Sequence, residues 1–184
     1  MMYAVFLRGI NTGGMTLLMD DFKHLLEMAG CKHVVTIQAA GTAVFTLEQP
    51  IDANRQAEIE MRLSQHMGKQ VSLFIKSASE IAIMAELVAR QKSSAEYHDY
   101  VVIIRENQVY DGVVALHEKI PFMPGERLIR GDGFFIWTIM KGHTLSEFGS
   151  RVLGSKKLKE HLTSRNATTL LKIAAKMGLF PAGN

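Results

Sequence analysis

The residue types best suited to bind a ligand lie together in the segment Leu7-Arg8-Gly9-Ile10-Asn11-Thr12-Gly13-Gly14. Glycines allow backbone N–H groups to approach a ligand closely, and an arginine supplies positive charge. The segment therefore predicts a site for a phosphate- or carboxylate-bearing ligand. The candidate binding residues are Arg8, Gly9, Asn11, Gly13 and Gly14. A structural role accounts for the same residues: the glycines would adopt positive φ, Arg8 would pair with an acid, and Asn11 would bond the loop backbone.

Other chemistries find less support in the sequence. The stretch from Gly9 to Thr16 is one residue from a phosphate-binding loop, but Met15 stands where lysine is required, which argues against nucleotide hydrolysis. None of the seven histidines has a metal-ligand spacing, so we expect no metal and no cofactor. The chain has no Gly-x-Ser-x-Gly or Ser-x-x-Lys pattern, so no residue is assigned a catalytic role.

Hydrophobic periodicity predicts the elements that position this loop. The first part of the chain reads as β-α-β-β-α-β, with helices ending at Gly30 and Gly68. Asp20 and Asp52 are the expected caps of these helices. The expected strands are residues 2–10, 33–38, 42–47 and 70–76, and the expected helices are residues 20–29 and 52–67. Two right-handed crossovers in this order predict a ferredoxin-like α+β domain over residues 1–76.

This topology places the loop after the first strand beside the turn between the second and third strands. Gln38 and Thr42 should then complete the polar rim of the site around Arg8, although about thirty residues separate them along the chain.

The second part, residues 77–184, is expected to form a second, smaller α+β domain. Ser77 and Glu80 have the spacing of a capping box at the start of a helix. Asp111-Gly112 is typical of a turn. We expect a strand over residues 99–105, a hairpin over residues 127–130 and 134–140, and two closing helices over residues 155–162 and 166–177. Asn166 is the expected cap of the last helix.

Composition narrows the class of protein. The longest apolar run, Phe134 to Met140, is far shorter than the ~18 residues that span a bilayer, so we expect no membrane association. Cys31 is the only cysteine, which fits a reducing cytoplasm. From Arg151 onward there are seven Lys and Arg against Glu160 alone, so this segment carries +6 and the other 150 residues −3. The excess suggests an anionic partner, but lysines that solvate two surface helices are the preferred explanation.

Three motifs together resemble a bacterial family of uncharacterised proteins, domain of unknown function 1697. They are residues 8–14, Gly41-Thr42-Ala43-Val44-Phe45 and Thr163-Ser164-Arg165-Asn166. The resemblance implies a two-part α+β protein whose first part is ferredoxin-like, and it implies no activity. This chain has Ala40, Met15 and Ala167 where the family commonly has serine, lysine and tryptophan.

The favoured function is therefore binding of a small anionic ligand by the first loop. Arg165 lies beside a predicted helix cap without an evident structural need, and we predict that it borders the same pocket as Arg8. The alternatives are nucleic-acid binding through the basic C-terminal segment, an enzyme acting on a small anionic substrate, and an oligomeric scaffold. The sequence leaves the oligomeric state and the existence of a reaction undetermined.

Overall fold

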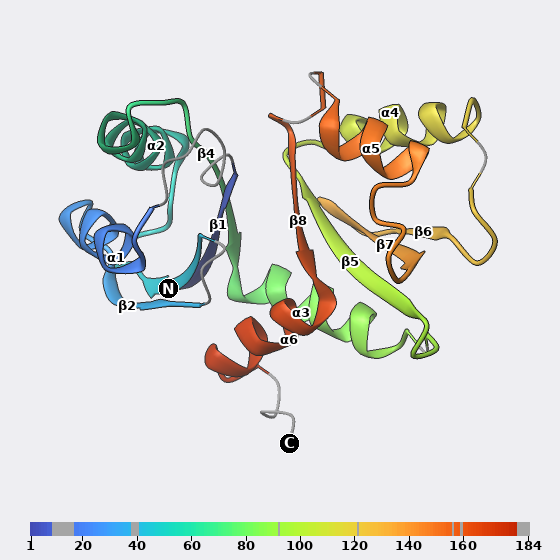
Figure 1. The fold of residues 1–184 in the computed structure, drawn as a ribbon. Helices are drawn as coiled ribbons and strands as arrows, with labels where there is room; N and C mark the ends of the chain where they lie inside the picture. Colours follow the sequence, from blue (N-terminus) through green and yellow to red (C-terminus); the bar gives the residue numbers. More distant parts are fainter. Residues whose placement is uncertain are drawn as a thin grey trace. The chain divides into compact units, whose positions relative to one another are not determined.

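The protein is a mixed α+β structure with two four-stranded antiparallel sheets (Figure 1). The computed structural model describes residues 1–8, 17–37, 41–91, 93–120, 122–155, 157–158 and 160–179. The chain divides into two compact units. The first unit comprises residues 1–82 and 173–184, and the second unit comprises residues 83–172. The predicted α+β class is confirmed, while the predicted domain boundary after Lys76 stays a prediction.

The first unit follows the element order that the sequence predicts. Its elements are β1 (Met2–Arg8), α1 (Met19–Met28), β2 (Lys32–Thr36), β3 (Thr42–Thr46), α2 (Ala53–Met67) and β4 (Ser72–Ser77). The strand order is β2-β3-β1-β4, and every neighbouring pair is antiparallel. This order fits the expected ferredoxin-like arrangement.

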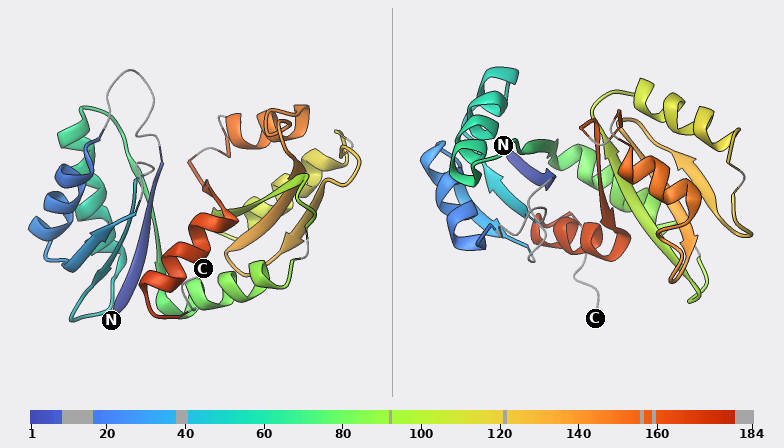
Figure 2. Two further views of the ribbon diagram at one scale, coloured as in Figure 1. Left: turned by 60° about the horizontal axis from the view of Figure 1, so that its bottom comes forward. Right: turned by 45° about the horizontal axis from the view of Figure 1, so that its top comes forward.

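Helices α1 and α2 cover one face of this sheet (Figures 1 and 2). Phe22 and Leu26 of α1 and Leu63 of α2 are fully buried, and they pack in one cluster with Val5 and other residues of β1. Helical periodicity puts these side chains on one stripe, so a single apolar face explains both helices. The core of the first unit therefore lies between the helices and the sheet.

The caps of these helices agree only in part with expectation. Asp52 caps α2, since its carboxylate accepts from the Arg55 N–H at 2.7 Å. Helix α1 instead begins after Leu18, whose side chain makes no capping hydrogen bond, so the prediction that Asp20 is the cap is wrong. Asp20 lies inside the first turn, where its charge favours the positive end of the helix dipole.

Helix α3 (Ala78–Ala89) follows directly after β4. The predicted capping box is present: the Ser77 N–H donates to Glu80 Oε2 at 2.8 Å, and the Glu80 N–H donates to Ser77 Oγ at 3.3 Å. Both ends of this reciprocal pair satisfy amides that the first helical turn leaves without partners.

The second unit repeats the architecture of the first. Its elements are β5 (Tyr97–Ile104), α4 (Gln108–His117), β6 (Arg127–Arg130), β7 (Phe134–Met140), α5 (Glu147–Gly154) and β8 (Leu162–Asn166), and α6 (Ala167–Lys176) follows. The strand order β6-β7-β5-β8 is that of the first sheet, with each strand replaced by its counterpart. Both units are therefore β-α-β-β-α-β, and the expected β6–β7 hairpin is confirmed.

Two local predictions for this unit are wrong. Asp111-Gly112 lies inside α4 rather than in a turn. The predicted helix over residues 155–162 is wrong, because α5 ends at Gly154, the described residues after it are not helical, and Leu162 already belongs to β8. Leu162 pairs with Ile104 of β5 and is fully buried, so sheet pairing overrides the local pattern there.

In the part of the chain that the structure describes, no helix combines the length and the apolar character that a membrane span requires.

Candidate functional site

Arg8, the charged residue of the predicted site, is the last residue of β1 and lies opposite Ser72 at the start of β4. Its side chain is half-buried, and this burial lowers the pKa of the guanidinium because the charged form loses hydration. Arginine nevertheless stays protonated in proteins. The end of β1 thus presents a partly desolvated positive charge.

The turn between β2 and β3 lies at this same end of the sheet. The Leu7 N–H donates to Gly41 O at 2.7 Å, and the Ile37 N–H donates to Thr42 O at 2.7 Å. Thr42 is fully buried and pairs with Phe6. Gly41 has φ 61°, a left-handed conformation that favours glycine. The predicted proximity of the β1 end and this turn is therefore present in the fold.

The other proposed ligand residues of this region lie outside the described residues. They are Gly9, Asn11, Gly13, Gly14 and Gln38. Their participation in a site stays a prediction.

Arg165 has a structural role that the sequence did not reveal. It belongs to β8 in the second unit, and its Nη1 donates to Thr163 Oγ1 at 3.1 Å and to Ser164 O at 2.8 Å. The predicted cap beside it is confirmed, since Asn166 Oδ1 accepts from the Thr168 N–H at 3.0 Å. A pocket shared by Arg165 and Arg8 stays a prediction.

The basic residues of the C-terminal segment are distributed over several elements. Arg151 belongs to α5, Arg165 to β8, and Lys172 and Lys176 to α6, while Lys157 lies in a turn. Lys156 and Lys159 lie outside the described residues. Nucleic-acid binding by this segment stays a hypothesis.

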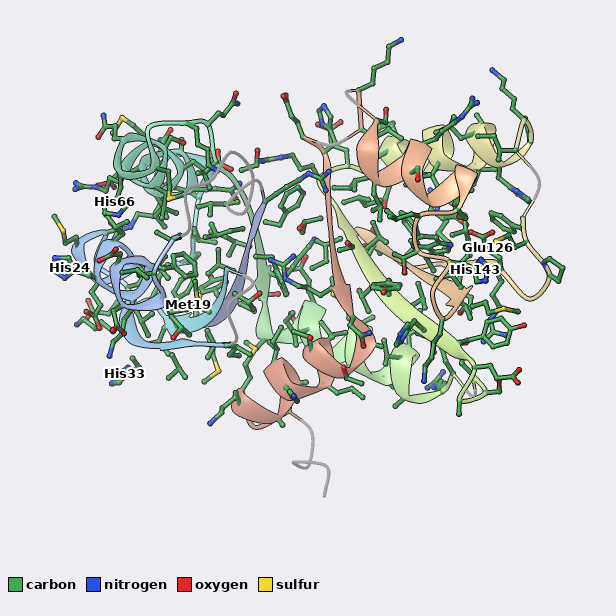
Figure 3. The ribbon with its side chains drawn as sticks, in the orientation of Figure 1. Met19, His24, His33, His66, Glu126 and His143 are labelled. Atoms are coloured by element: carbon green, nitrogen blue, oxygen red, sulfur yellow. The ribbon has the colours of Figure 1, made fainter. Side chains whose placement is uncertain are left out.

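Histidine is the commonest metal ligand among protein side chains. The histidines of the first unit, His24, His33 and His66, are exposed and separate (Figure 3). Among the residues that the structure describes, no three His, Cys, Asp or Glu side chains form a group that could hold a metal ion.

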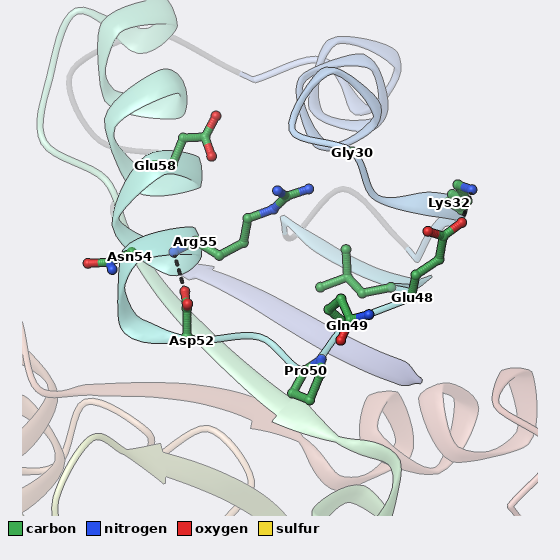
Figure 4. A pocket seen from close by; sticks show the side chains of 10 residues that line it. Gly30, Lys32, Glu48, Gln49, Pro50, Asp52, Asn54, Arg55 and Glu58 are labelled. Atoms are coloured by element: carbon green, nitrogen blue, oxygen red, sulfur yellow. Dashed lines mark hydrogen bonds and ion pairs between the residues drawn. The ribbon is translucent and has the colours of Figure 1, made fainter.

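A hollow that the sequence did not indicate lies at the opposite end of the first sheet from Arg8 (Figure 4). It has a volume of about 500 Å³. The end of α1, the β3–α2 connection and the first turns of α2 form it, with Gly30, Lys32, Leu47, Glu48, Gln49, Pro50, Asp52, Asn54, Arg55 and Glu58 as its lining. The Arg55 side chain reaches across the hollow from α2 toward Gly30, and its Nη2 donates to Ala29 O. Only the packing of α1 beside α2 creates this space, so no sequence motif marks it.

These features define an α+β protein built from two sheets of identical strand order. The chain belongs to the family described as "Protein of unknown function (DUF1697)", whose model matches residues 1–131. This confirms the resemblance that the three motifs suggested.

A solved structure, "conserved bacterial protein SP0830 from Streptococcus pneumoniae", is similar to this chain with a TM-score of 0.74. The two are 22% identical, and the similarity covers 96% of this chain and 98% of that one. At this identity the similarity shows the fold alone. A search of curated proteins found no match.

Proposed function

We propose that the first unit binds a phosphate- or carboxylate-bearing ligand at the C-terminal end of β1. The observation that carries the proposal is the half-buried Arg8 at a sheet end that also holds the β2–β3 turn. Arg8 supplies the charge, and charge-assisted hydrogen bonds from guanidinium to carboxylate or phosphate are strong. The amides of Gly9, Gly13 and Gly14 form the cradle. Asn11, Gln38 and Thr42 provide the polar rim.

The second unit supports this assignment because it fills the corresponding place with its own groups. There the Ile104 N–H donates to Gly133 O at 3.0 Å, which repeats the Leu7–Gly41 bond of the first unit. Asn107 makes two hydrogen bonds to the turn between β6 and β7. Its Nδ2 donates to Asp132 Oδ1 at 2.9 Å, and its Oδ1 accepts from the Gly133 N–H at 3.0 Å.

The matching turn of the first unit, residues 38–41, reads Gln-Ala-Ala-Gly and contains no acid. Asp132 of the second unit therefore has no acidic counterpart in this turn. The glycine-rich sequence of residues 9–14 supports a ligand as the source of negative charge for Arg8.

The test is a titration of ¹⁵N-labelled protein with inorganic phosphate, followed by amide chemical shifts. Phosphate should shift the amides of Leu7, Gly41 and Thr42, and Arg8→Gln should weaken binding by about tenfold or more. Arg90→Gln is the matched control, since Arg90 is an exposed arginine that follows α3 and pairs with Glu86. The proposal fails if phosphate shifts none of these amides, or if Arg8→Gln binds phosphate as tightly as the unaltered protein.

A further inference from the structure

The two sheets correspond residue by residue along their two central strands. Tyr3 pairs with Phe45 in the first sheet, and Tyr100 pairs with Trp137 in the second. The rings of each pair are in contact, with centroids 5.9 Å and 5.7 Å apart. The second helices begin alike, because Asp52 caps α2 and Ser146 caps α5 through the amide three residues later. The place in the second unit that corresponds to the hollow of the first unit can therefore be identified.

In the second unit an aromatic side chain fills that place. The Phe122 ring stacks on His117 at the end of α4 and meets Phe148 in the first turn of α5, with centroids 4.9 Å apart. Phe122 comes from the connection between α4 and β6, which comprises residues 118–126. In the first unit the corresponding connection comprises only residues 29–31. The short connection has no side chain to fill the space, and a hollow of about 500 Å³ remains.

The hollow has the size and surface to accept a ring from outside. Its volume lies within the range of about 300–1,000 Å³ that is usual for small-molecule sites. Leu47 and Pro50 give it an apolar side, and the Arg55 guanidinium lies against Gly30, in the space that a side chain there would take. A flat apolar group can therefore lie here as Phe122 does in the second unit.

Three acids and two bases line the hollow, and Arg55 is the base available to an anion. Its three acids are already engaged: Glu48 pairs with Lys32, Glu58 with Arg62 at 2.9 Å, and Asp52 with the Arg55 N–H. Arg55 Nη2 bonds the Ala29 carbonyl, whereas its buried Nε has no hydrogen-bond partner among the described residues.

No ion pair of Arg55 occurs in the part of the chain that the structure describes. A partly buried guanidinium without a counter-charge is unfavourable, and a carboxylate would compensate it.

We propose that this hollow binds a small aromatic carboxylate. The ring occupies the place that Phe122 takes in the second unit, and the carboxylate pairs with Arg55. This site is at the opposite end of the sheet from Arg8, so it is independent of the function proposed above.

Phenylacetate is the probe, with 2-phenylethanol as the uncharged analogue and acetate as the analogue without a ring. In an NMR titration of the full chain, phenylacetate should shift the amides of Gly30 and Asn54, and each analogue should bind at least about tenfold more weakly. Arg55→Gln should lower the affinity by about tenfold. Glu58→Gln removes a neighbouring negative charge and should raise it by about twofold to threefold. The control Arg90→Gln should bind as the unaltered protein does.

The opposite effects of Arg55→Gln and Glu58→Gln are the readout that a merely structural Arg55 would not produce. Phenylacetate that leaves Gly30 and Asn54 unshifted at about 10 mM overturns the proposal. Equal binding of 2-phenylethanol overturns the anionic part. If Arg55→Gln does not fold, the Glu58→Gln result alone decides, and an affinity that is unchanged or reduced contradicts the proposal.

Discussion

The two units share one topology but differ in what closes the ends of their sheets. In the second unit, side chains of the unit itself close both ends: Asn107 and Asp132 at one, and Phe122 at the other. In the first unit, the corresponding positions hold a turn without an acid at one end and a hollow of about 500 Å³ at the other. The difference teaches that one β-α-β-β-α-β frame can be used both as a self-contained structure and as a candidate ligand-binding unit.

A buried carboxylate strengthens the closure of the second unit. Glu126 is only 7% exposed, and it accepts from Trp137 Nε1 at 2.8 Å and from the Met123 N–H at 2.9 Å (Figure 3). These two bonds attach the connection that carries Phe122 to the sheet. In the first unit, Cys31 takes the position of Glu126, immediately before the edge strand. The connection between α1 and β2 is only three residues long, so it needs no such attachment to the sheet.

The largest effect should come from Trp137, the aromatic residue that joins these features. Trp137→Ala removes a fully packed ring and leaves the Glu126 carboxylate with one partner fewer, so we expect a loss of about 3–5 kcal/mol in unfolding free energy. Phe45→Ala, at the matching position of the first unit, should fall at the lower end of this range because Phe45 has no polar bond to lose. Urea denaturation followed by circular dichroism measures both. A greater loss for Phe45→Ala would contradict the comparison.

The core of the first unit is tested by Leu26→Ala. Leu26 is fully buried in the cluster of α1, α2 and β1, so its truncation should cost about 2–5 kcal/mol. Leu18→Ala is a suitable control, because Leu18 is 63% exposed just before the same helix. Chemical denaturation should show little change for the control. A loss below about 1 kcal/mol for Leu26→Ala would mean that the first unit is loosely packed as well as open at its ends.

The closed turn of the second unit is tested by Asn107→Ala. The change removes two hydrogen bonds that fix Asp132 and Gly133, and it should cost about 1–3 kcal/mol. Arg8→Gln, at the corresponding end of the first unit, should cost less than about 1 kcal/mol if ligand binding is its main role. Thermal unfolding of both variants without phosphate measures the difference. If Arg8→Gln loses more unfolding free energy than Asn107→Ala, the main role of Arg8 is to stabilise the fold.

The smallest effect concerns Cys31 at high pH. Burial raises the pKa of its thiol to about 11, although the positive charge of Arg55 acts in the opposite direction. An unfolded thiol ionises near pH ~8.5, so the folded state disfavours the thiolate. The stabilisation is therefore complete below that pH and is lost as the pH rises toward the folded value. Between about pH 8 and 10, the unfolding free energy of the Cys31→Ala variant, measured by urea denaturation, should fall less than that of the unaltered protein. If both proteins lose the same unfolding free energy over this pH range, the raised pKa of Cys31 is contradicted.

The sequence by itself determined much of the first unit. The β-α-β-β-α-β order, the end of α2 at Gly68 and the Asp52 cap follow from local periodicity and hydrogen bonding, and they appear as expected. The position of Arg8 beside the β2–β3 turn also followed, because right-handed crossovers leave few topologies for this element order. Local signals suffice where helix, strand and turn chemistry agree.

Only the tertiary structure decided the rest. Residues 162–166 carry no strong strand pattern, yet pairing with β5 and burial of Leu162 make them β8. The repetition of the first unit by the second is visible only in strand order and register, because the matching positions hold different residues, such as Phe45 and Trp137. The hollow beside Arg55 depends on the length of one connection and on the packing of α1 against α2. Neither a cavity nor a long-range strand pair is encoded in neighbouring residues, since both arise from segments that are distant in the chain.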